Sequence, residues 1–427
     1  MPACSCRHHA SRLTAALPVR VEMIAMAPWY CCQLGAREHY AVPRALHRDG
    51  RLGRLFTDAW TPPRTLLGRR DQGRYHAGLA RAPVTAFTGS LLTFALAQRW
   101  RGGRGWELTL ARNRWFERQA LGELRSLAGA ADGSGQPPVL FAYSYAALDL
   151  LRFARERGWR TVLGQIDPGP WEEEIVRREH ARTPALQPGW RTAPPAYWQR
   201  WAEECALADR IVVNSPWSED ALRRQNIPAA KLDVVPLAFE PADGLPPPKK
   251  YPARFTAERP LRVLFLGQIT LRKGVARLLE AAELLAGAPV EFWLAGPVGI
   301  DRAAVPDRVR PSLRWLGPVA REKTAACLRA ADVFLLPTLS DGFALTQLEA
   351  LAQRLPVVAS RCCGPAVRDG VDGLLLPEVS AEAIAGALRA CWLAPDRLAE
   401  FSRAAGVREE FTLPTLGKRL AALSGSV

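Results

Sequence analysis

A basic turn in the second half of the chain has the composition of a phosphate-binding loop. The segment GQITLRKG, residues 267–274, directly follows an apolar run and opens a helical pattern. A helix start presents unpaired backbone N–H groups and the positive end of the helix dipole, and Arg272 and Lys273 add two cations there. The segment matches neither the Walker pattern nor the Gly-x-Gly-x-x-Gly fingerprint. Taken alone, it fits phosphate binding and a solvated basic turn equally well.

Two carboxylates and a glycine follow a later apolar run, in SDGFALTQLEALAQRLPVVAS (340–360). Asp341 and Gly342 lie in the loop after the predicted strand, and Glu349 lies about one turn inside the predicted helix. Gly342 lets the backbone approach a ligand closely, and the amides of 342–345 can receive an anion. One carboxylate could then hold sugar hydroxyls and the other a ribose diol. Alternatively, Asp341 is a helix cap and Glu349 a solvated helix charge.

A third segment, 99–118, alternates arginine with aromatic residues. Its sequence is RWRGGRGWELTLARNRWFER, with aromatic side chains at Trp100, Trp106, Trp115 and Phe116. Such interleaving suits the surface of an anionic membrane, a carbohydrate acceptor groove or stacking on nucleic-acid bases. The alternative is an amphipathic helix that packs its aromatic side chains inward.

Alternating apolar runs and helical patterns must position these segments. In the first half, the predicted strands lie at 21–27, 54–57, 138–143, 160–166, 210–214 and 232–236. The predicted helices lie at 33–48, with a glycine near its start, and at 145–157, 196–208 and 216–225. Residues 58–120 are expected to be irregular. Short apolar runs between helical patterns indicate a parallel sheet covered on both faces.

A proline-rich stretch, 241–260, separates this half from a second alternating series. Three consecutive prolines cannot lie inside a helix, so the stretch is expected to be a linker and the domain boundary. Beyond it, the predicted strands lie at 261–267, 290–295, 313–316, 332–336, 356–360 and 373–376. The predicted helices lie at 274–286, 321–331, 344–354 and 380–393, and the last residues are amphipathic.

The fold class that follows is α/β, with two Rossmann-like, doubly wound domains that face a cleft. We expect an N-terminal domain over 21–240 and a second domain over 261–400. A helical segment over 401–427 could pack back on the N-terminal domain. In such sheets, ligands bind beyond the carboxyl ends of the strands.

The composition excludes several classes of protein. The 427 residues are 48% hydrophobic and 23% charged, which excludes wholesale disorder, collagen and a simple coiled coil. The net charge of +15 favours polyanionic partners, but it is spread over both halves without a nucleic-acid motif, so no nucleic-acid partner is expected. The nine cysteines are expected to be reduced thiols of a cytosolic protein.

The N-terminal segment contains little that predicts structure. Residues 1–20 make a poor signal peptide and are expected to be a disordered leader before the first strand. Its possible metal ligands fit no zinc spacing; they are Cys4, Cys6, His8 and His9. No apolar run in the chain reaches the ~18 residues that a transmembrane helix needs.

The order and spacing of the two glycine-containing motifs resemble the family-4 (group 1) glycosyltransferases, which have the GT-B fold. In that family, Gly-Arg-x4-Lys-Gly is followed by Glu-Gly-Phe-Gly and, after seven intervening residues, by a second Glu. The corresponding residues here are Gly267, Gln268, Lys273 and Gly274, and then Asp341 and Glu349 with seven residues between them. Three further segments are similar to parts of the family, namely 33–46, 203–241 and 363–377.

The resemblance implies that the first domain, 21–240, is the acceptor side and that the second domain, 261–400, binds the nucleotide-sugar donor. It also implies a role for each of these residues. It places Lys273 on the donor diphosphate, Asp341 near the donor sugar and Glu349 on the nucleotide ribose. The backbone residues expected to meet sugar and phosphate are Gly342, Phe343, Ala344 and Leu345. The base is expected to pack at Pro318 and Val319, and Gly35 is expected to line the facing loop of the first domain.

This chain also departs from the family pattern. Gln268 stands where the family has Arg, so one positive charge is missing, and we expect Arg272 to restore it. Asp341 is one methylene shorter than Glu, and Ala344 replaces a Gly. Where the family often has a His near the donor sugar, this chain has FAYSYAA (141–147).

The function predicted on this basis is sugar transfer from a nucleotide-diphosphate sugar to a glycan, lipid-linked or small-molecule acceptor. The resemblance implies a retaining glycosyltransferase of hexosyl type. Lys273, Arg272 and the helix mouth at 342–345 would stabilise the leaving diphosphate. Asp167 is a candidate acceptor base, the alternative being a turn residue before Pro168. No Asp-x-Asp cluster stands out, so no metal and no cofactor beyond the donor are expected.

Two further expectations concern an alternative function and the location of the protein. The alternative function is that of a non-catalytic protein that binds a nucleotide sugar in a degenerate site, because Gln268 and Asp341 depart from the family's motif. The protein is expected in the cytoplasm, with 99–118 suited to peripheral contact with the inner, anionic face of a membrane.

Overall fold

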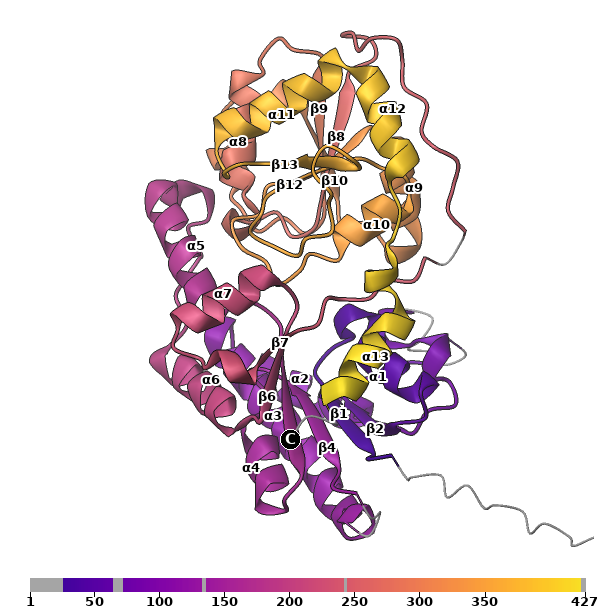
Figure 1. Cartoon of the computed structure of the whole chain (residues 1–427). Coiled ribbons are helices and arrows are strands. Elements are labelled where there is room, and N and C mark those ends of the chain that lie inside the picture. The colour runs from indigo at the N-terminus through magenta and orange to yellow at the C-terminus, as the bar shows by residue number, and fades with distance from the viewer. Residues whose placement is uncertain (1–25, 64–71, 133–135, 242–243, 424–427) are drawn as a thin grey trace, which may run out of the picture.

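Two parallel sheets organise the chain. The computed structural model describes residues 26–63, 72–132, 136–241 and 244–423. The first sheet has seven strands in the order β3-β2-β1-β4-β5-β6-β7, and the second has six in the order β10-β9-β8-β11-β12-β13. Every strand pair in both sheets is parallel. Each sheet forms the centre of one α/β domain, and the two domains meet near α5 and α7 (Figure 1).

The first domain alternates strands with helices. Its strands are β1 (Trp29–Gln33), β2 (Leu52–Thr57), β3 (Val84–Ala86), β4 (Val139–Tyr143), β5 (Arg160–Gln165), β6 (Arg210–Val213) and β7 (Leu232–Val234). Its helices are α1 (Ala41–Arg48), α2 (Thr88–Trp100), α3 (Gly105–Asp132), α4 (Leu148–Glu156), α5 (Pro170–Arg182), α6 (Pro195–Leu207) and α7 (Pro216–Arg224). Successive residues of β1 enter opposite cores, Cys31 on one face and Cys32 on the other, so helices cover both faces of the sheet.

The second domain repeats this arrangement. Its strands are β8 (Leu261–Leu266), β9 (Val290–Ala295), β10 (Leu313–Gly317), β11 (Val333–Leu336), β12 (Val357–Ala359) and β13 (Gly373–Leu375). Its helices are α8 (Val275–Leu284), α9 (Arg321–Ala330), α10 (Thr346–Ala352), α11 (Ala381–Leu393) and α12 (Pro395–Ala404). Val263 and Leu264, neighbours on β8, again pack in separate cores on the two faces of the sheet.

The C-terminal helix returns to the first domain. Helix α13 (Leu413–Leu423) lies beside α1 in Figure 1, and Leu416 and Leu420 share a core with Trp29 and Leu46. The chain thus crosses between the domains twice, once before β8 and once before α13. The first crossing includes the proline-rich stretch, whose described residues, 241 and 244–260, form neither helix nor strand.

The first strand lies later in the chain than the apolar pattern predicted. The run at 21–27 was expected to be a strand, but β1 begins at Trp29, and the two described residues of that run, 26 and 27, are not in a strand. The strand contains Cys31 and Cys32, each 1% exposed, which pack as small apolar side chains. Most of that run and the whole expected leader, 1–20, lie outside the described residues.

The expectation of irregular structure over 58–120 was wrong. The segment contains β3, all of α2 and the first half of α3. Helix α2 has no fully buried residue and α3 continues past Gly122, so neither has a simple apolar stripe with clear ends. Helix α5 was missed because most of its own side chains are charged and only Val176 and Glu179 are buried, so it has no apolar stripe.

Candidate active site

The basic turn and the loop after β11 pack directly on each other. The turn ends in a short 3-10 segment, Leu271–Lys273, and α8 starts after Gly274, whose φ is +77°. A Cβ on Gly274 would lie 1.9 Å from the carbonyl oxygen of Pro337, so this approach requires glycine. The packing brings the two motifs that the sequence singled out into contact.

The predicted cations and the first predicted carboxylate form one cluster. Lys273 Nζ is paired with Asp341 Oδ2, and both side chains are only 14% exposed. Arg272 Nη1 lies 3.8 Å from the same Asp341 oxygen and 3.6 Å from Glu172 Oε1 on α5. It also donates a hydrogen bond to the carbonyl of Ser340 at 3.3 Å. Glu172, which sequence reasoning did not find, joins this cluster from the first domain.

Burial shifts the titration of two members of this cluster. Burial, followed by repulsion from Arg272, lowers the pKa of Lys273 to about 7. Burial raises the pKa of Glu172 to about 7, while attraction by Arg272 opposes the rise. A bound anion would add negative charge beside Lys273 and favour its protonated form.

The loop after β11 presents unbonded amides. In the described ranges, no acceptor is found for the backbone N–H groups of 342–345. Ala344 has a φ of +64°, in the left-handed region where the family has Gly. Phe343 is buried and packs edge-on against Phe411, with 5.5 Å between the ring centroids, which fixes the loop. The loop therefore offers fixed N–H donors beside the cations.

Gly342 also joins the two domains. A Cβ there would lie 2.3 Å from the carbonyl oxygen of Ile166 in the loop after β5. Ser215 Oγ, at the start of α7, donates a hydrogen bond to the Gly342 carbonyl at 2.6 Å. Trp217 Nε1 donates to Ser340 Oγ at 3.2 Å. The absence of a side chain at Gly342 thus serves domain contact, a role that its sequence context did not suggest.

Glu349 does not join this cluster. It lines a separate hollow of about 150 Å³ with Arg321 from α9 and with His39 and Glu240 from the first domain. Burial raises the pKa of Glu349, and Arg321 opposes the rise. Val319, next to the exposed Pro318, is half-buried against the core of the second domain.

Gly35 lies in the loop that follows β1. Its φ is +85°, and its amide donates to Asp58 Oδ1 at 2.9 Å. The same carboxylate pairs with Arg74 at 2.8 Å and Arg112 at 2.7 Å. The Gly35 amide is therefore bonded to protein, in contrast to the amides of 342–345.

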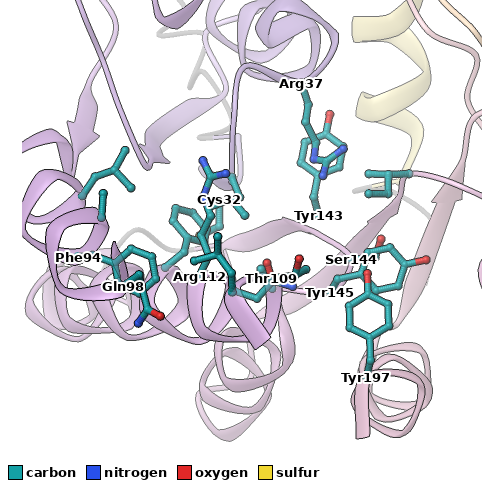
Figure 2. Close-up of a pocket in the computed structure, with 18 of the residues that line it drawn as sticks. Cys32, Arg37, Phe94, Gln98, Thr109, Arg112, Tyr143, Ser144, Tyr145 and Tyr197 are labelled. Carbon is teal, nitrogen blue, oxygen red and sulfur yellow. The ribbon is translucent and has the colours of Figure 1, made fainter. Parts of the chain in front are cut away.

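A hollow of about 230 Å³ lies between the domains, beside the cation cluster. The second domain contributes Gln268, Thr270 and Arg272, and the first domain contributes Asp167 and Tyr197. A larger cavity of about 640 Å³ lies within the first domain (Figure 2). Asp167 and Tyr197 line both spaces, so the two cavities meet at these side chains.

Asp167 is held by its neighbours through one oxygen. Its Oδ1 accepts hydrogen bonds from the Tyr145 hydroxyl and from the Gly169 amide, the latter at 2.9 Å. Tyr145 has a φ of +76°, and its ring stacks on Tyr197 with 4.8 Å between the ring centroids. Burial, followed by repulsion from Asp167, raises the pKa of Tyr145 well above its usual value, so this hydroxyl stays protonated and donates.

Glu204 on α6 fixes the turn that carries Tyr145. Its two oxygens accept the amides of Tyr145 at 2.7 Å and Ala147 at 3.0 Å. Burial raises the pKa of Glu204 to about 8. Sequence reasoning missed this residue. No local pattern distinguishes it from the adjacent Glu203.

The aromatic residues of 99–118 divide between the inside and the outside of the domain. Trp115 is 6% exposed and stacks on Phe94 at 5.3 Å, so the inward-packing interpretation holds for it. Trp106 donates to the carbonyl of Arg191 at 3.1 Å and contacts Tyr197. Trp100 is 89% exposed.

Two features are absent from the part of the chain that the structure describes. No helix there combines the length and apolar character needed to cross a bilayer. Over the same residues, no group of three or more His, Cys, Asp or Glu side chains is arranged to hold a metal ion.

Comparison with known sequences identifies relatives of part of this chain. The family described as "Glycosyl transferases group 1" matches residues 260–393. A protein of Mycolicibacterium paratuberculosis named D-inositol 3-phosphate glycosyltransferase is 32% identical over 252 residues, which cover 53% of this chain and 56% of that protein. A protein of the same name from Mycobacteroides abscessus is 35% identical over 213 residues, covering 46% and 47%. This chain spans about half the length of the curated relatives that it matches.

Solved structures share the whole fold. HepE of Anabaena, in complex with UDP, superposes with a TM-score of 0.60 at 14% identity, covering 94% of this chain and 100% of that one. Sucrose-phosphate synthase from Thermosynechococcus elongatus gives a TM-score of 0.59 at 18% identity, covering 93% and 98%. Residues 260–393 thus match the group 1 glycosyltransferases, and the chain as a whole has the GT-B fold.

Proposed function

We propose that this protein is a glycosyltransferase that uses a nucleotide-diphosphate sugar. The observation that carries the proposal is the cluster of Lys273 and Arg272 beside the unbonded amides of 342–345, at the domain boundary. Fixed cations and helix-start amides are the groups that bind a diphosphate. The match of the second domain to group 1 glycosyltransferases supports this reading, as does HepE, which was solved with UDP-glucose.

The same groups would assist the chemical step. Breaking the bond between sugar and diphosphate leaves negative charge on the departing nucleoside diphosphate. Preorganised donors aimed at developing charge typically supply ~3–4 kcal/mol each. Because Asp341 is paired with Lys273 in the free protein, the donor must displace it. Asp341 is then released to bind hydroxyls of the donor sugar.

Finer features of the reaction follow from the resemblance to the family-4 enzymes. We propose a retaining transfer of a hexosyl group, without a metal ion, to a glycan, lipid-linked or small-molecule acceptor in the cytoplasm. In this proposal Lys273, Arg272 and the amides of 342–345 provide the charge stabilisation. Glu349, with Arg321 beside it, would hold the ribose in the separate hollow that these two side chains line.

A panel of nucleotides tests this proposal. UDP, GDP, ADP and their glucose derivatives are titrated into the purified full chain by calorimetry, and release of nucleotide is then followed with a mixture of acceptors. We expect one nucleotide series to bind and its sugar to be transferred. If none binds, the proposal is wrong.

The alternative, a binding protein with a degenerate site, has two supporting observations. Gln268 supplies no charge, and in the free protein the Lys273 ammonium is already paired with the Asp341 carboxylate. This alternative predicts that a nucleotide sugar binds and is recovered intact, with neither transfer nor slow hydrolysis. Release of free nucleotide that is lost in Lys273→Ala would exclude it.

We also propose that contact with an anionic membrane is made by the outer face of α2. Leu92, Leu96 and Trp100 are exposed at a spacing of four residues and form one stripe. Exposed arginines flank Trp100, which gives the stripe a charge complementary to anionic lipid. Trp100→Ala is expected to weaken sedimentation with phosphatidylglycerol vesicles, while Trp106→Ala, which removes a side chain packed on Tyr197, leaves it unchanged. Equal sedimentation of wild type and Trp100→Ala contradicts this contact.

A further inference from the structure

The cavity within the first domain has the size of a small-molecule site. Its volume of about 640 Å³ lies within the ~300–1,000 Å³ typical of ligand pockets. Helices α2 and α3 form one side, and the carboxyl ends of β1, β4 and β5 form the other (Figure 2). No residue of the second domain lines it, so it is separate from the cation cluster.

One end of this cavity contains a cluster of apolar side chains. They come from α2 and α3 and are Leu91, Phe94, Ala95, Leu108 and Phe116, and the same helices also contribute Gln98, Arg99, Thr109, Arg112 and Asn113 to the lining. Phe94 is stacked on the buried Trp115, which holds this wall in place. A surface of this kind binds hydrocarbon or an aromatic ring by excluding water.

The other end is polar and has unused hydrogen-bonding groups. Ser144 is 3% exposed, and within the described residues its Oγ has no hydrogen-bond partner. The same holds for Nε of Arg37, whose guanidinium lies over the Tyr143 ring, with 5.7 Å from its central carbon to the ring centroid. A buried polar atom without a partner costs free energy, which a polar group of a ligand would recover. This end is therefore suited to a hydroxyl-bearing head group.

Asp167 connects the polar end with the hollow between the domains. Its Oδ1 is occupied by Tyr145 and Gly169, whereas its Oδ2 accepts no hydrogen bond from the described residues. Because Asp167 also lines the hollow that contains Gln268 and Arg272, a hydroxyl beside Oδ2 would face the donor side.

We propose that this cavity binds the acceptor and that the acceptor is an amphiphile. Its hydrocarbon or aromatic body lies between α2 and α3, and its hydroxyl-bearing head lies near Ser144 and Asp167. The inference rests on the proposed function, because it assigns the second substrate of that reaction. In the transfer, the acceptor oxygen bonds to the anomeric carbon and its proton passes to Asp167. The bond from that carbon to the diphosphate breaks, and the electron pair leaves with the diphosphate.

A matched pair of glucosides tests the apolar part of this proposal. Octyl glucoside, below its micelle concentration, and methyl glucoside carry the same head group and differ only in the alkyl chain. Both are titrated into the full chain without donor. We expect octyl glucoside to bind at least about tenfold more tightly, because each buried methylene contributes about 0.8 kcal/mol. Equal affinities would overturn the proposal.

Substitutions at two neighbouring leucines of α2 distinguish binding in the cavity from binding to other apolar surfaces. Leu91 lines the cavity, whereas Leu92 is 51% exposed on the outer face of the same helix. Leu91→Gln is expected to lower the preference for octyl glucoside about tenfold, whereas Leu92→Gln preserves it. Ala95→Trp is a second variant expected to lose the preference, because the larger side chain would fill the cavity. Ala95 lies on α2, which has no buried residue. A preference that survives both Leu91→Gln and Ala95→Trp means that the chain binds elsewhere, and the proposal fails.

Titration of UDP into the same samples keeps the two proposals apart. We expect UDP affinity to be unchanged in all three variants, because the cavity contains no residue of the second domain. Wild-type protein that binds octyl glucoside but no nucleotide would contradict the proposed function alone. Wild-type protein that binds UDP but treats the two glucosides alike would contradict the acceptor inference alone.

Discussion

The two cavities that meet at Asp167 differ in the kind of chemistry that lines them. The hollow between the domains lies beside Lys273, Arg272 and Asp341, whose charges are close together and mostly buried. The cavity of the first domain is lined mainly by aromatic and aliphatic side chains, together with polar and charged side chains that include Arg37, Arg99 and Arg112. Fixed charges recognise a diphosphate whatever is attached to it, whereas an apolar cavity selects its ligand by size and shape. In our account, the first space serves the donor and the second the acceptor.

The largest expected effect comes from removing the buried cation. Lys273→Ala is expected to weaken UDP binding about 10- to 100-fold, because a charge-assisted hydrogen bond contributes about 1.5–3 kcal/mol. Calorimetric titration measures the loss. Lys418→Ala, which removes an exposed lysine of α13, is the control and should bind UDP like the wild type. Unaltered UDP affinity in Lys273→Ala would mean that the diphosphate binds elsewhere.

The motifs that led to Lys273 could be found in the sequence because each is a short continuous segment at the end of an apolar strand. The strand order then brings the ends of β8 and β11 together, since these strands are neighbours in the sheet. The pairing of Lys273 with Asp341 is a result of this neighbourhood. Their separation from Glu349 was not predictable, because it depends on how α10 and α9 face the first domain.

The acceptor cavity could not be predicted in the same way. Its side chains come from β1, α2, α3, β4, the loop after β5 and α6, which are spread over most of the first domain. Helix α2 has apolar residues on both sides, so its sequence has no clear amphipathic period. Glu204, which fixes the turn at Tyr145, acts through tertiary contacts that no local pattern contains.

The pH dependence of nucleotide binding is the next largest effect. Since the pKa of Lys273 is lowered to about 7 in the free protein, the side chain is largely neutral at higher pH. A bound diphosphate raises this pKa, so binding above pH 7 takes up a proton and UDP affinity falls as pH rises, by up to about tenfold per unit. Calorimetry at about pH 8 in buffers of different ionisation enthalpy measures the uptake. Lys273→Ala should show a smaller uptake than the wild type. Proton release on binding to the wild type would reverse the predicted sign.

Asp341 has opposite expected effects on nucleotide binding and on sugar transfer. Asp341→Asn removes the negative partner of Lys273, so we expect UDP to bind about threefold more tightly. Sugar transfer should fall, because the amide no longer accepts sugar hydroxyls as a carboxylate does. Titration and a transfer assay on the same preparation separate the two effects, with Asp396→Asn on the exposed face of α12 as the control. A loss of both UDP binding and sugar transfer would indicate that Asp341 only maintains the loop.

The smallest expected effect concerns the strained backbone of the donor loop. Ala344→Gly should raise the free energy of unfolding by about 0.5–1 kcal/mol, because Ala344 has a φ of +64° that glycine adopts without a Cβ clash. Urea denaturation of the full chain measures the change. Ala387→Gly, inside α11, is expected to lower stability by a similar amount. A loss of stability in Ala344→Gly would show that the methyl group contributes more through packing than the backbone loses through strain.

An experimental structure of the complex with UDP would show which of the two spaces binds the donor. We expect the terminal phosphate to lie within hydrogen-bonding distance of Lys273 Nζ and of at least one amide of 342–345, with Asp341 displaced from the lysine. A nucleotide bound in the cavity of the first domain, with the pair of Lys273 and Asp341 intact, would contradict the assignment of donor and acceptor to the two spaces.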